Sequence, residues 1–302
     1  MEKAGKIKKH CVFLSRRHRP QGDIPFAQKP MTEELSPSAR IPHTLYLRLS
    51  DSRICFARYE MREKPYFTFS PYRLQPHVSL TVNLRTAVQS ESILNAPIGE
   101  TVVLVSGTVT PVPLADFQEE DGNAIYNYCL PNESPHRVFY DIVPAANVVL
   151  LYSLDEQTCR NIEEIFNNVR YVSSLTPVLR KFSSKGITSQ PQKRFFIYCH
   201  EKSIDVAVFD DTHLLMVNSY PINGETDIAY YVLNLTRHMA VNSSAIPVYV
   251  AGEPAERNKA AETIGAFIPN VFCINPSGEF NRHIVSTTEG VPYDLMALLI
   301  EQ

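Results

Sequence analysis

Closely spaced cysteines are missing from this chain, and with them the usual signature of a metal or redox site. The six cysteines lie far apart, no two are separated by only two residues, and no histidine stands at zinc-finger spacing. Cys55, Cys199 and Cys273 lie inside apolar runs, where a reduced thiol acts as a small core residue. We therefore expect no metal site, no redox chemistry and a cytoplasmic location.

Long apolar runs are missing too. The longest, residues 142–152, is interrupted by Pro144 and Asn147 and falls short of the about 18 residues that a membrane-spanning helix needs. Near the start of the chain, the short apolar stretch 11–14 is followed at once by Arg16 and Arg17, unlike the core of a signal peptide. We expect neither a membrane span nor an export signal.

An excess of positive charge is missing outside the first residues, where acidic residues outnumber basic ones. Residues 1–30 hold eight Lys or Arg against two acids, a net charge of +6, so the rest of the chain carries −9. This basic segment has no apolar periodicity, which predicts a solvated, disordered tail over 1–41 or a true start at Met31. A role for the tail in binding RNA or lipid is the less favoured alternative. Nucleic-acid binding by the acidic body is disfavoured, because phosphates require clustered Lys and Arg.

Familiar catalytic and phosphate-binding motifs are also missing. Neither G-x-x-x-x-G-K-[ST] nor G-x-G-x-x-G occurs. Nucleophilic catalysis would require a Ser or Cys paired with a histidine. The sequence indicates no such partner for His200 or His213. Asp210 and Asp211 are adjacent carboxylates, but their position predicts a hairpin turn rather than an acid and base pair.

An internal repeat is the clearest feature present. Residues 45–59 and 195–209 each read as an apolar strand, a short polar turn and a second apolar strand. A third strand follows in each half, at 66–69 and 213–218. Amphipathic helices come next, over 80–88 in the first half and 228–239 in the second.

Each half then continues with a strand, a helix, a strand and a helix. In the first half the strand 148–152 leads through a Ser153-x-x-Glu156 capping box into a helix ending near Phe166. In the second, the strand 246–250 precedes a helix opened by Pro254, and a closing helix covers about 293–299. Because hairpins pair antiparallel and helical crossovers pair parallel, we expect mixed sheets covered by helices on both faces.

The two halves differ in length. The first hairpin begins 105 residues before Leu150, whereas the second begins only 53 residues before Val248. This difference predicts an insertion in the first half, at about residues 92–142. The polar stretch 183–191 predicts the linker, which gives a first lobe over 42–186 and a second over 191–302.

The duplicated order of elements resembles the actin-like ATPase superfamily, whose members pair two ribonuclease-H-like domains. More narrowly, the chain is similar to a family of uncharacterised Bacteroidetes proteins with this fold. The resemblance rests on the hairpins 45–59 and 195–209, on Phe69-Ser70-Pro71 and on the stretch 111–117. It implies an α/β fold of two ribonuclease-H-like lobes with mixed sheets flanked by helices, and it carries no assigned reaction.

The resemblance also implies which residues would bind a nucleotide. Its two hairpin turns each combine an Asp with glycines, so that the backbone can approach the phosphates of ATP while the Asp holds Mg²⁺. In this sequence the corresponding candidates are Asp51 and Ser52 in the first turn and Glu201 and Lys202 in the second. Neither turn contains a glycine, and each could equally be an ordinary polar turn.

A third candidate completes the nucleotide site that the resemblance implies. The superfamily's adenosine-contacting turn corresponds to Gly252 and Glu253, where only one glycine of the usual pair is present. An ordinary loop between strand and helix accounts for these two residues as well.

Two functions remain open from the sequence. The preferred prediction is a non-catalytic binding or scaffold protein that has no cofactor, is not an enzyme and contacts another protein. The alternative is an ATP-dependent enzyme or ATP-regulated switch, in which Asp51, Glu201 and Gly252 still bind ATP with Mg²⁺.

Overall fold

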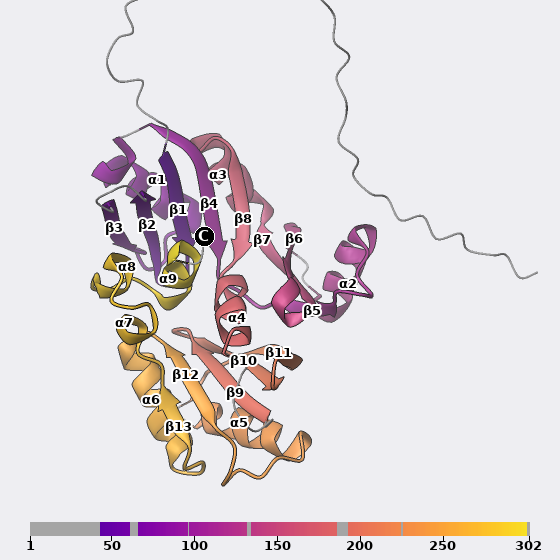
Figure 1. Ribbon diagram of the computed structural model, residues 1–302. Coiled ribbons are helices and arrows are strands. Elements are labelled where there is room, and N and C mark those ends of the chain that lie inside the picture. Colours follow the sequence, from indigo (N-terminus) through magenta and orange to yellow (C-terminus); the bar gives the residue numbers. More distant parts are fainter. Residues whose placement is uncertain are drawn as a thin grey trace, which may run out of the picture. The chain divides into compact units, whose positions relative to one another are not determined.

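The computed structural model describes residues 43–60, 66–95, 97–131, 134–185, 193–224 and 226–300. The predicted tail over 1–41, its possible start at Met31 and most of the predicted linker lie outside these residues. The first sheet has the strand order β3-β2-β1-β4-β8 (Figure 1). Its strands are β1 (His43–Leu49), β2 (Arg53–Glu60), β3 (Tyr66–Arg73), β4 (Ile98–Val105) and β8 (Val169–Ser173).

The second sheet repeats the first. Its order is β11-β10-β9-β12-β13, formed by β9 (Lys193–Cys199), β10 (Ser203–Asp210), β11 (His213–Pro221), β12 (Val248–Gly252) and β13 (Val271–Cys273). In both sheets the first three strands pair antiparallel and the last two pair parallel. The α/β fold of two mixed, helix-flanked sheets that the repeat predicted is therefore confirmed.

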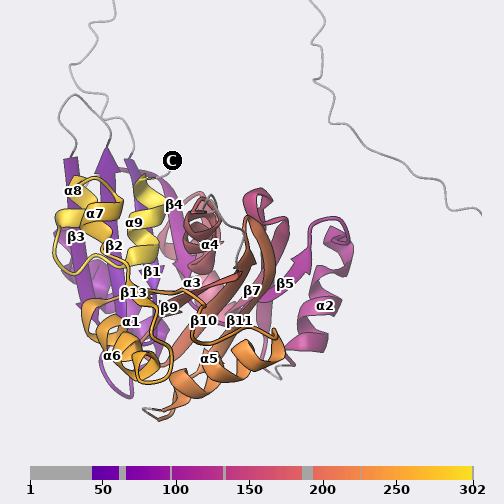
Figure 2. The same cartoon turned by 60° about the horizontal axis from the view of Figure 1, so that its bottom comes forward.

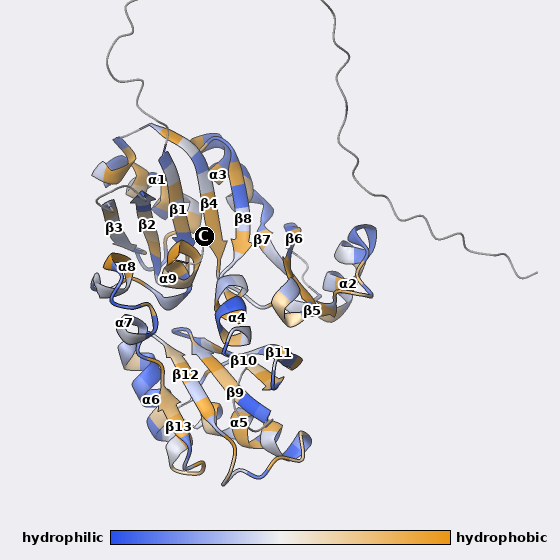
Figure 3. Cartoon of the chain, viewed as in Figure 1, coloured by the Kyte–Doolittle hydropathy of each residue, from blue (hydrophilic) through white to orange (hydrophobic). Residues whose placement is uncertain are grey.

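Strand β9 shows how the second sheet is buried on both faces. Alternate residues point to opposite sides of a strand, and here Phe195 and Ile197 belong to one apolar cluster while Phe196 and Tyr198 belong to another. The first face packs under α5 (Asp227–His238) and α6 (Pro254–Gly265), as predicted from their apolar stripe and Pro254. Figure 3 shows the apolar strand interiors and the hydrophilic outer side of α6.

A third, three-stranded sheet corrects the predicted insertion. Its order is β5-β7-β6, built from β5 (Thr110–Pro113), β6 (His136–Val143) and β7 (Val148–Asp155), with α2 (Gly122–Cys129) over one face. The prediction that 148–152 is the fourth strand of the first sheet is wrong, because β4 takes that place beside β1. The segment 92–142 therefore contains β4 of the main sheet, and the added sheet extends to β7.

The cap of the helix after β7 lies two residues later than predicted, at Asp155 and not at Ser153. Helix α3 runs from Glu156 to Ile165, and the Asp155 carboxylate accepts the Thr158 N–H at 2.8 Å. The predicted capping box at Ser153 is wrong, because β7 continues through that residue. Asp155 is the N-cap in place of Ser153, since its carboxylate oxygen accepts a hydrogen bond from one of the free N–H groups of the first turn.

Two helices pack on the sheet of the half to which they do not belong in sequence. Helix α4 (Leu175–Ser183) follows β8, yet its Phe182 ring stacks on Phe196 of β9 with centroids 4.7 Å apart. Helix α9 (Tyr293–Ile300) closes the second half but lies in front of β1 in the first sheet (Figure 1). Helices α1 (Leu80–Ser90) and α3 cover the opposite face of that sheet (Figure 2).

Short helical segments complete the described fold. They are η1 (Ser92–Asn95), η2 (Glu119–Asp121), η3 (Pro144–Ala146), α7 (Pro276–Glu279) and α8 (Ile284–Thr287).

Candidate functional site

Two polar hairpin turns meet between the sheets. The turn 50–52 joins β1 to β2, and the turn 200–202 joins β9 to β10. They border a cavity of about 70 Å³. It is lined by Arg48, Ser50, Asp51, Ser106, Gly107, Tyr198, Cys199, His200, Glu201, Ser203, Glu253 and Glu256. Such a volume holds about two water molecules, whereas pockets for small organic ligands measure about 300–1,000 Å³.

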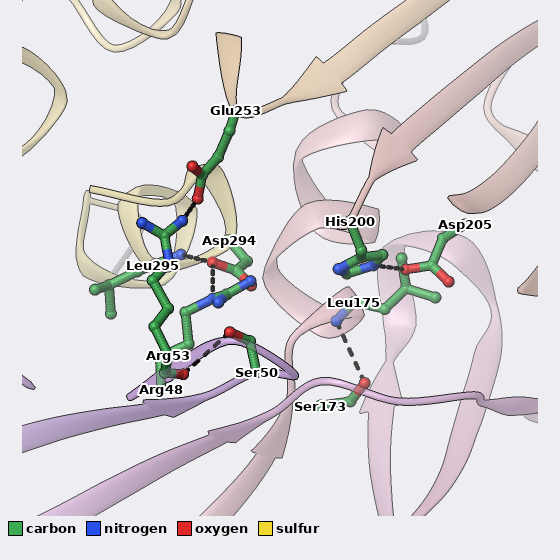
Figure 4. A network of polar contacts seen from close by, with 10 residues as sticks. All are labelled: Arg48, Ser50, Arg53, Ser173, Leu175, His200, Asp205, Glu253, Asp294 and Leu295. Carbon is green, nitrogen blue, oxygen red and sulfur yellow. Dashed lines mark hydrogen bonds and ion pairs between the residues drawn. The ribbon is translucent and has the colours of Figure 1, made fainter. Parts of the chain in front are cut away.

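Side chains from the two lobes touch directly across this cavity. Ser52 donates its hydroxyl hydrogen to Glu201, linking the first turn to the second. The guanidinium of Arg53 pairs with the carboxylate of Glu253 at the start of α6. Figure 4 shows Arg53, the first residue of β2, reaching toward Glu253. These contacts cross the space between the two turns and the start of α6.

A buried ion pair fastens the floor of the cleft. Arg48 Nε donates to both carboxylate oxygens of Asp294 in α9, at 2.8 and 2.7 Å, and both side chains are almost fully buried (Figure 4). Burial alone would lower the pKa of Arg48, but the Asp294 carboxylate raises it. Burial and then the same carboxylate raise the pKa of Tyr198 well above its usual value. The guanidinium is thus charged, already paired and not free for a phosphate.

A second group of hydrogen-bonded polar side chains lies in the second lobe. His200 Nε2 is 2.6 Å from Asp205 Oδ2, and Ser219 Oγ donates to Asp205 Oδ1 at 2.5 Å. In a hydrolytic triad the histidine stands between the serine and the acid, so that it can take the serine's proton. In this chain the carboxylate stands between them, so Ser219 is bonded to Asp205 and not to the histidine. The arrangement positions the His200 ring and is not that of a hydrolytic triad.

The electrostatics of the cavity oppose an anionic ligand. Four carboxylate residues line it, Asp51, Glu201, Glu253 and Glu256, whereas its one lining guanidinium, Arg48, is paired with Asp294. Within the described residues, no three His, Cys, Asp or Glu side chains converge in a group that could hold a metal ion. In this arrangement the lining residues do not fit a magnesium nucleotide.

The buried thiols near the cleft are protonated at neutral pH. Burial raises the pKa of Cys55 to about 11 and the pKa of Cys199 to about 12. Because the thiolate is the reactive form of cysteine, neither residue is a nucleophile.

Gly252 has a packing role that accounts for it without a nucleotide. Its φ is +134°, and a Cβ at this position would lie 2.8 Å from the Cys199 carbonyl oxygen and 2.9 Å from the Cys199 Cβ. Strand β12 pairs with β9 at these two residues. The glycine thus permits the close approach of two neighbouring strands.

The structure brings most of the predicted candidates together. Asp51, Glu201 and Glu253 line the cavity, and Ser52 reaches it through its bond to Glu201. Lys202 is exposed and is not part of the cavity lining. Whether any of these residues binds a nucleotide remains a prediction.

Sequence reasoning missed Arg48, Tyr198 and Asp294. The first and last were visible as single charges inside otherwise apolar segments, the strand 45–49 and the helix 293–300. A charge in such a place usually has a buried partner. No local pattern indicates that these two residues, 246 positions apart, are partners of each other.

The family of the chain follows from its sequence as a whole. A family model described as "Protein of unknown function (DUF3822)" matches residues 33–271. The chain belongs to this family. No curated protein matches the chain.

Solved structures place this DUF3822 member among actin-like folds. A Bacteroides thetaiotaomicron VPI-5482 protein with an actin-like ATPase fold and unknown function matches with a TM-score of 0.73 and 23% identity. The match covers 85% of this chain and 95% of that one. A chain of the PilM-PilN type IV pilus biogenesis complex matches with a TM-score of 0.54 and 11% identity, over 85% and 97% of the two chains.

These likenesses confirm the resemblance inferred from the repeated hairpins. The DUF3822 chain has the actin-like ATPase fold, and its relative in Bacteroides likewise has no known function. At these identities the likeness concerns the fold and assigns no activity. No helix in the described part of the chain is both long and apolar enough to cross a membrane.

Proposed function

We propose that this DUF3822 member is a non-catalytic binding or scaffold protein. Its nucleotide cleft is closed by its own side chains, and the fold serves contacts with another protein. The observation that carries the proposal is the pair of contacts across the cleft, Ser52 with Glu201 and Arg53 with Glu253. Both contacts lie at the turns that, by the resemblance, would bind the phosphates and the adenosine.

Volume and charge support the same conclusion. A cavity of about 70 Å³ is far smaller than the about 300–1,000 Å³ of pockets that bind small organic ligands. Asp51, Glu201 and Glu256 would repel the ligand's negative charges, while the positive charges of Arg48 and Arg53 are paired with Asp294 and Glu253. That a chain of similar fold occurs in the PilM-PilN complex supports a protein as the partner.

ATP binding is the competing proposal, and one observation favours it. A second cavity, of about 240 Å³, adjoins the first through Cys199, His200, Glu201 and Glu256. It extends to Ile228 at the start of α5 and to Lys259 of α6. A nucleoside could occupy this space, but its phosphates would require the contacts between the lobes to open.

Isothermal titration of the full-length protein with Mg-ATP decides between the two. We expect no saturable heat at micromolar ligand. A saturable micromolar isotherm would replace the scaffold proposal with an ATP-binding enzyme or switch.

A matched variant tests the stated cause. Replacing Ser52 and Glu201 together with glycine removes the bond between the turns and restores the residue type that superfamily turns use. Binding that appears only in this double variant would mean that the side chains are the obstruction. Binding by the unmodified chain at equal affinity would refute that cause.

A further inference from the structure

The free edges of two different sheets border one groove. Strand β11 ends the second sheet and β5 ends the three-stranded sheet, and the two lie side by side in both views (Figures 1 and 2). The groove between them has a volume of about 570 Å³ and is lined by residues of β5, by 145–148 and by 212–217. Its size falls within the range of about 300–1,000 Å³ found for ligand pockets.

The backbone of β11 offers hydrogen bonds to this groove. Ile222 N donates to Lys202 O, which fixes the alternation along the pair β10 and β11. Residues 216, 218 and 220 therefore bond toward β10, while Val217 directs its N–H and C=O groups to the free edge. Ser219 directs its C=O group there, whereas its N–H donates to Asn218 Oδ1 at 3.0 Å. Leu215 has no partner in the register with β10. An added strand could pair with this edge.

The edge of β5 is different. Leu114 N donates to Asn147 O, so Thr110 and Val112 bond toward β7, and Pro111 and Pro113 face the free edge. Proline has no N–H, so this edge presents only carbonyl oxygens. A strand in the groove can therefore form a regular ladder with β11 and not with β5, which fixes the side on which it pairs.

Charge indicates the chemistry of the occupant. None of the twelve lining residues is Asp, Glu, Lys or Arg, and Leu214, Leu215, Met216 and Val148 make the walls largely apolar. The acidic turn Asp210-Asp211 directly precedes the lining residue Thr212 at one end of the groove. An uncharged, apolar strand with a basic residue at that end complements both features.

We propose that this groove binds an extended segment of a partner protein by adding a strand to β11. The segment is apolar along its length and carries Lys or Arg beside Asp210 and Asp211. This inference rests on the proposed role as a binding protein and names the chemistry of its partner. Main-chain bonds to Val217 and Ser219 supply affinity, and the apolar walls select the side chains.

Selection of short random peptides against the full-length protein provides the probe. We expect enriched peptides with apolar residues at alternate positions and a Lys or Arg at one end. With such a peptide bound, amide hydrogen exchange should slow over 213–219. Slowing confined to other elements, or no enriched pattern, would overturn the proposal.

Substitutions identify the surface. Leu215→Lys places a charge in the apolar groove at a residue that is 43% exposed, and should weaken the enriched peptide at least about tenfold. Ile284→Lys is the matched control, since Ile284 is 40% exposed and lies on α8, and it should leave affinity unchanged. Equal affinity in both variants would place the peptide elsewhere.

Two further measurements separate related outcomes. Asp210→Asn with Asp211→Asn should weaken only peptides with a basic end, and most strongly at low salt. Concentration-dependent dimerisation abolished by Leu215→Lys would make a second copy the occupant and overturn the partner proposal. The Mg-ATP titration stays independent of all these outcomes, so the groove can fail while the proposed function stands.

Discussion

Arg48 and Asp294 carry opposite charges and are almost fully buried. Removing one partner of such a pair leaves the other charged and buried, so Asp294→Asn should lower the free energy of unfolding by about 3–5 kcal/mol. Replacing both, by Arg48→Met with Asp294→Leu, should cost less. Urea denaturation measures both effects.

An exposed pair is the control for this buried one. Arg160 and Glu156 form an ion pair 2.6 Å long whose side chains are 59% and 38% exposed. Arg160→Met should cost at most about 1 kcal/mol. If Asp294→Asn costs no more than Arg160→Met, the pair at the cleft floor does not fasten the lobes.

Gly252 permits a close approach that no other residue type allows. Gly252→Ala should destabilise the fold by at least about 1–3 kcal/mol, because the added Cβ meets the Cys199 backbone and φ is positive. Gly107→Ala is the control, since a Cβ there has nothing within 4 Å. Thermal unfolding of both variants tests this, and equal midpoints would remove the packing account of Gly252.

Some residues of the candidate site could be predicted from the sequence. Asp51, Ser52 and Glu201 could be located from the repeat, because hairpin turns have strong local signals. Their mutual contacts could not, since Ser52 and Glu201 are 149 residues apart and meet only through the packing of two lobes. The absence of glycine from both turns could be read from the sequence. The side-chain contacts between the turns could not.

Asp141 connects its strand to three other elements through one partly buried carboxylate. It accepts hydrogen bonds from Ser173 N at 2.7 Å, Thr176 Oγ1 at 2.6 Å and Tyr152 OH at 3.2 Å. This ties β6 to β7 and to the junction of β8 with α4. Burial raises the pKa of Asp141 by more than these bonds lower it.

A raised pKa makes the connection sensitive to pH. Between the unfolded value, about 3.9, and the higher folded value, the folded chain holds the extra proton. The contribution of Asp141 to stability is therefore present at low pH and is lost as pH rises through the folded pKa. The difference in unfolding free energy between the unmodified chain and Asp141→Asn should fall as pH rises, measured by urea denaturation.

A difference for Asp141→Asn that stays flat, or that grows with pH, would mean that its hydrogen bonds outweigh its burial.

At the level of elements, local patterns were informative where strands and helices form within one half. The hairpins, α5, α6 and α9 could be read from alternation, apolar stripes and Pro254. Strand β4 could not be told from β7, because both are short apolar runs of similar length and only sheet pairing separates them. Pairing depends on contacts distant in sequence, which no local window contains.

The two halves of the fold share one core. Buried residues of both five-stranded sheets, with α4 and α9, form a single apolar cluster that includes Leu47, Phe182, Phe196 and Leu295. This continuity arises because α4 and α9 each pack on the other half's sheet. The repeat in the sequence predicts two similar units, but it contains no information on this exchange of helices.

A shared core predicts that the described lobes unfold together. Ile264 of α6 is 1% exposed and belongs only to the second cluster, between α6 and the outer face of the second sheet. Ile264→Ala should cost about 2–5 kcal/mol. If the lobes are one cooperative unit, hydrogen exchange should accelerate in β1 as much as in β9, although β1 is untouched by the change. Faster exchange confined to β9–β13 would show two independent units, in which α4 and α9 cross without coupling them.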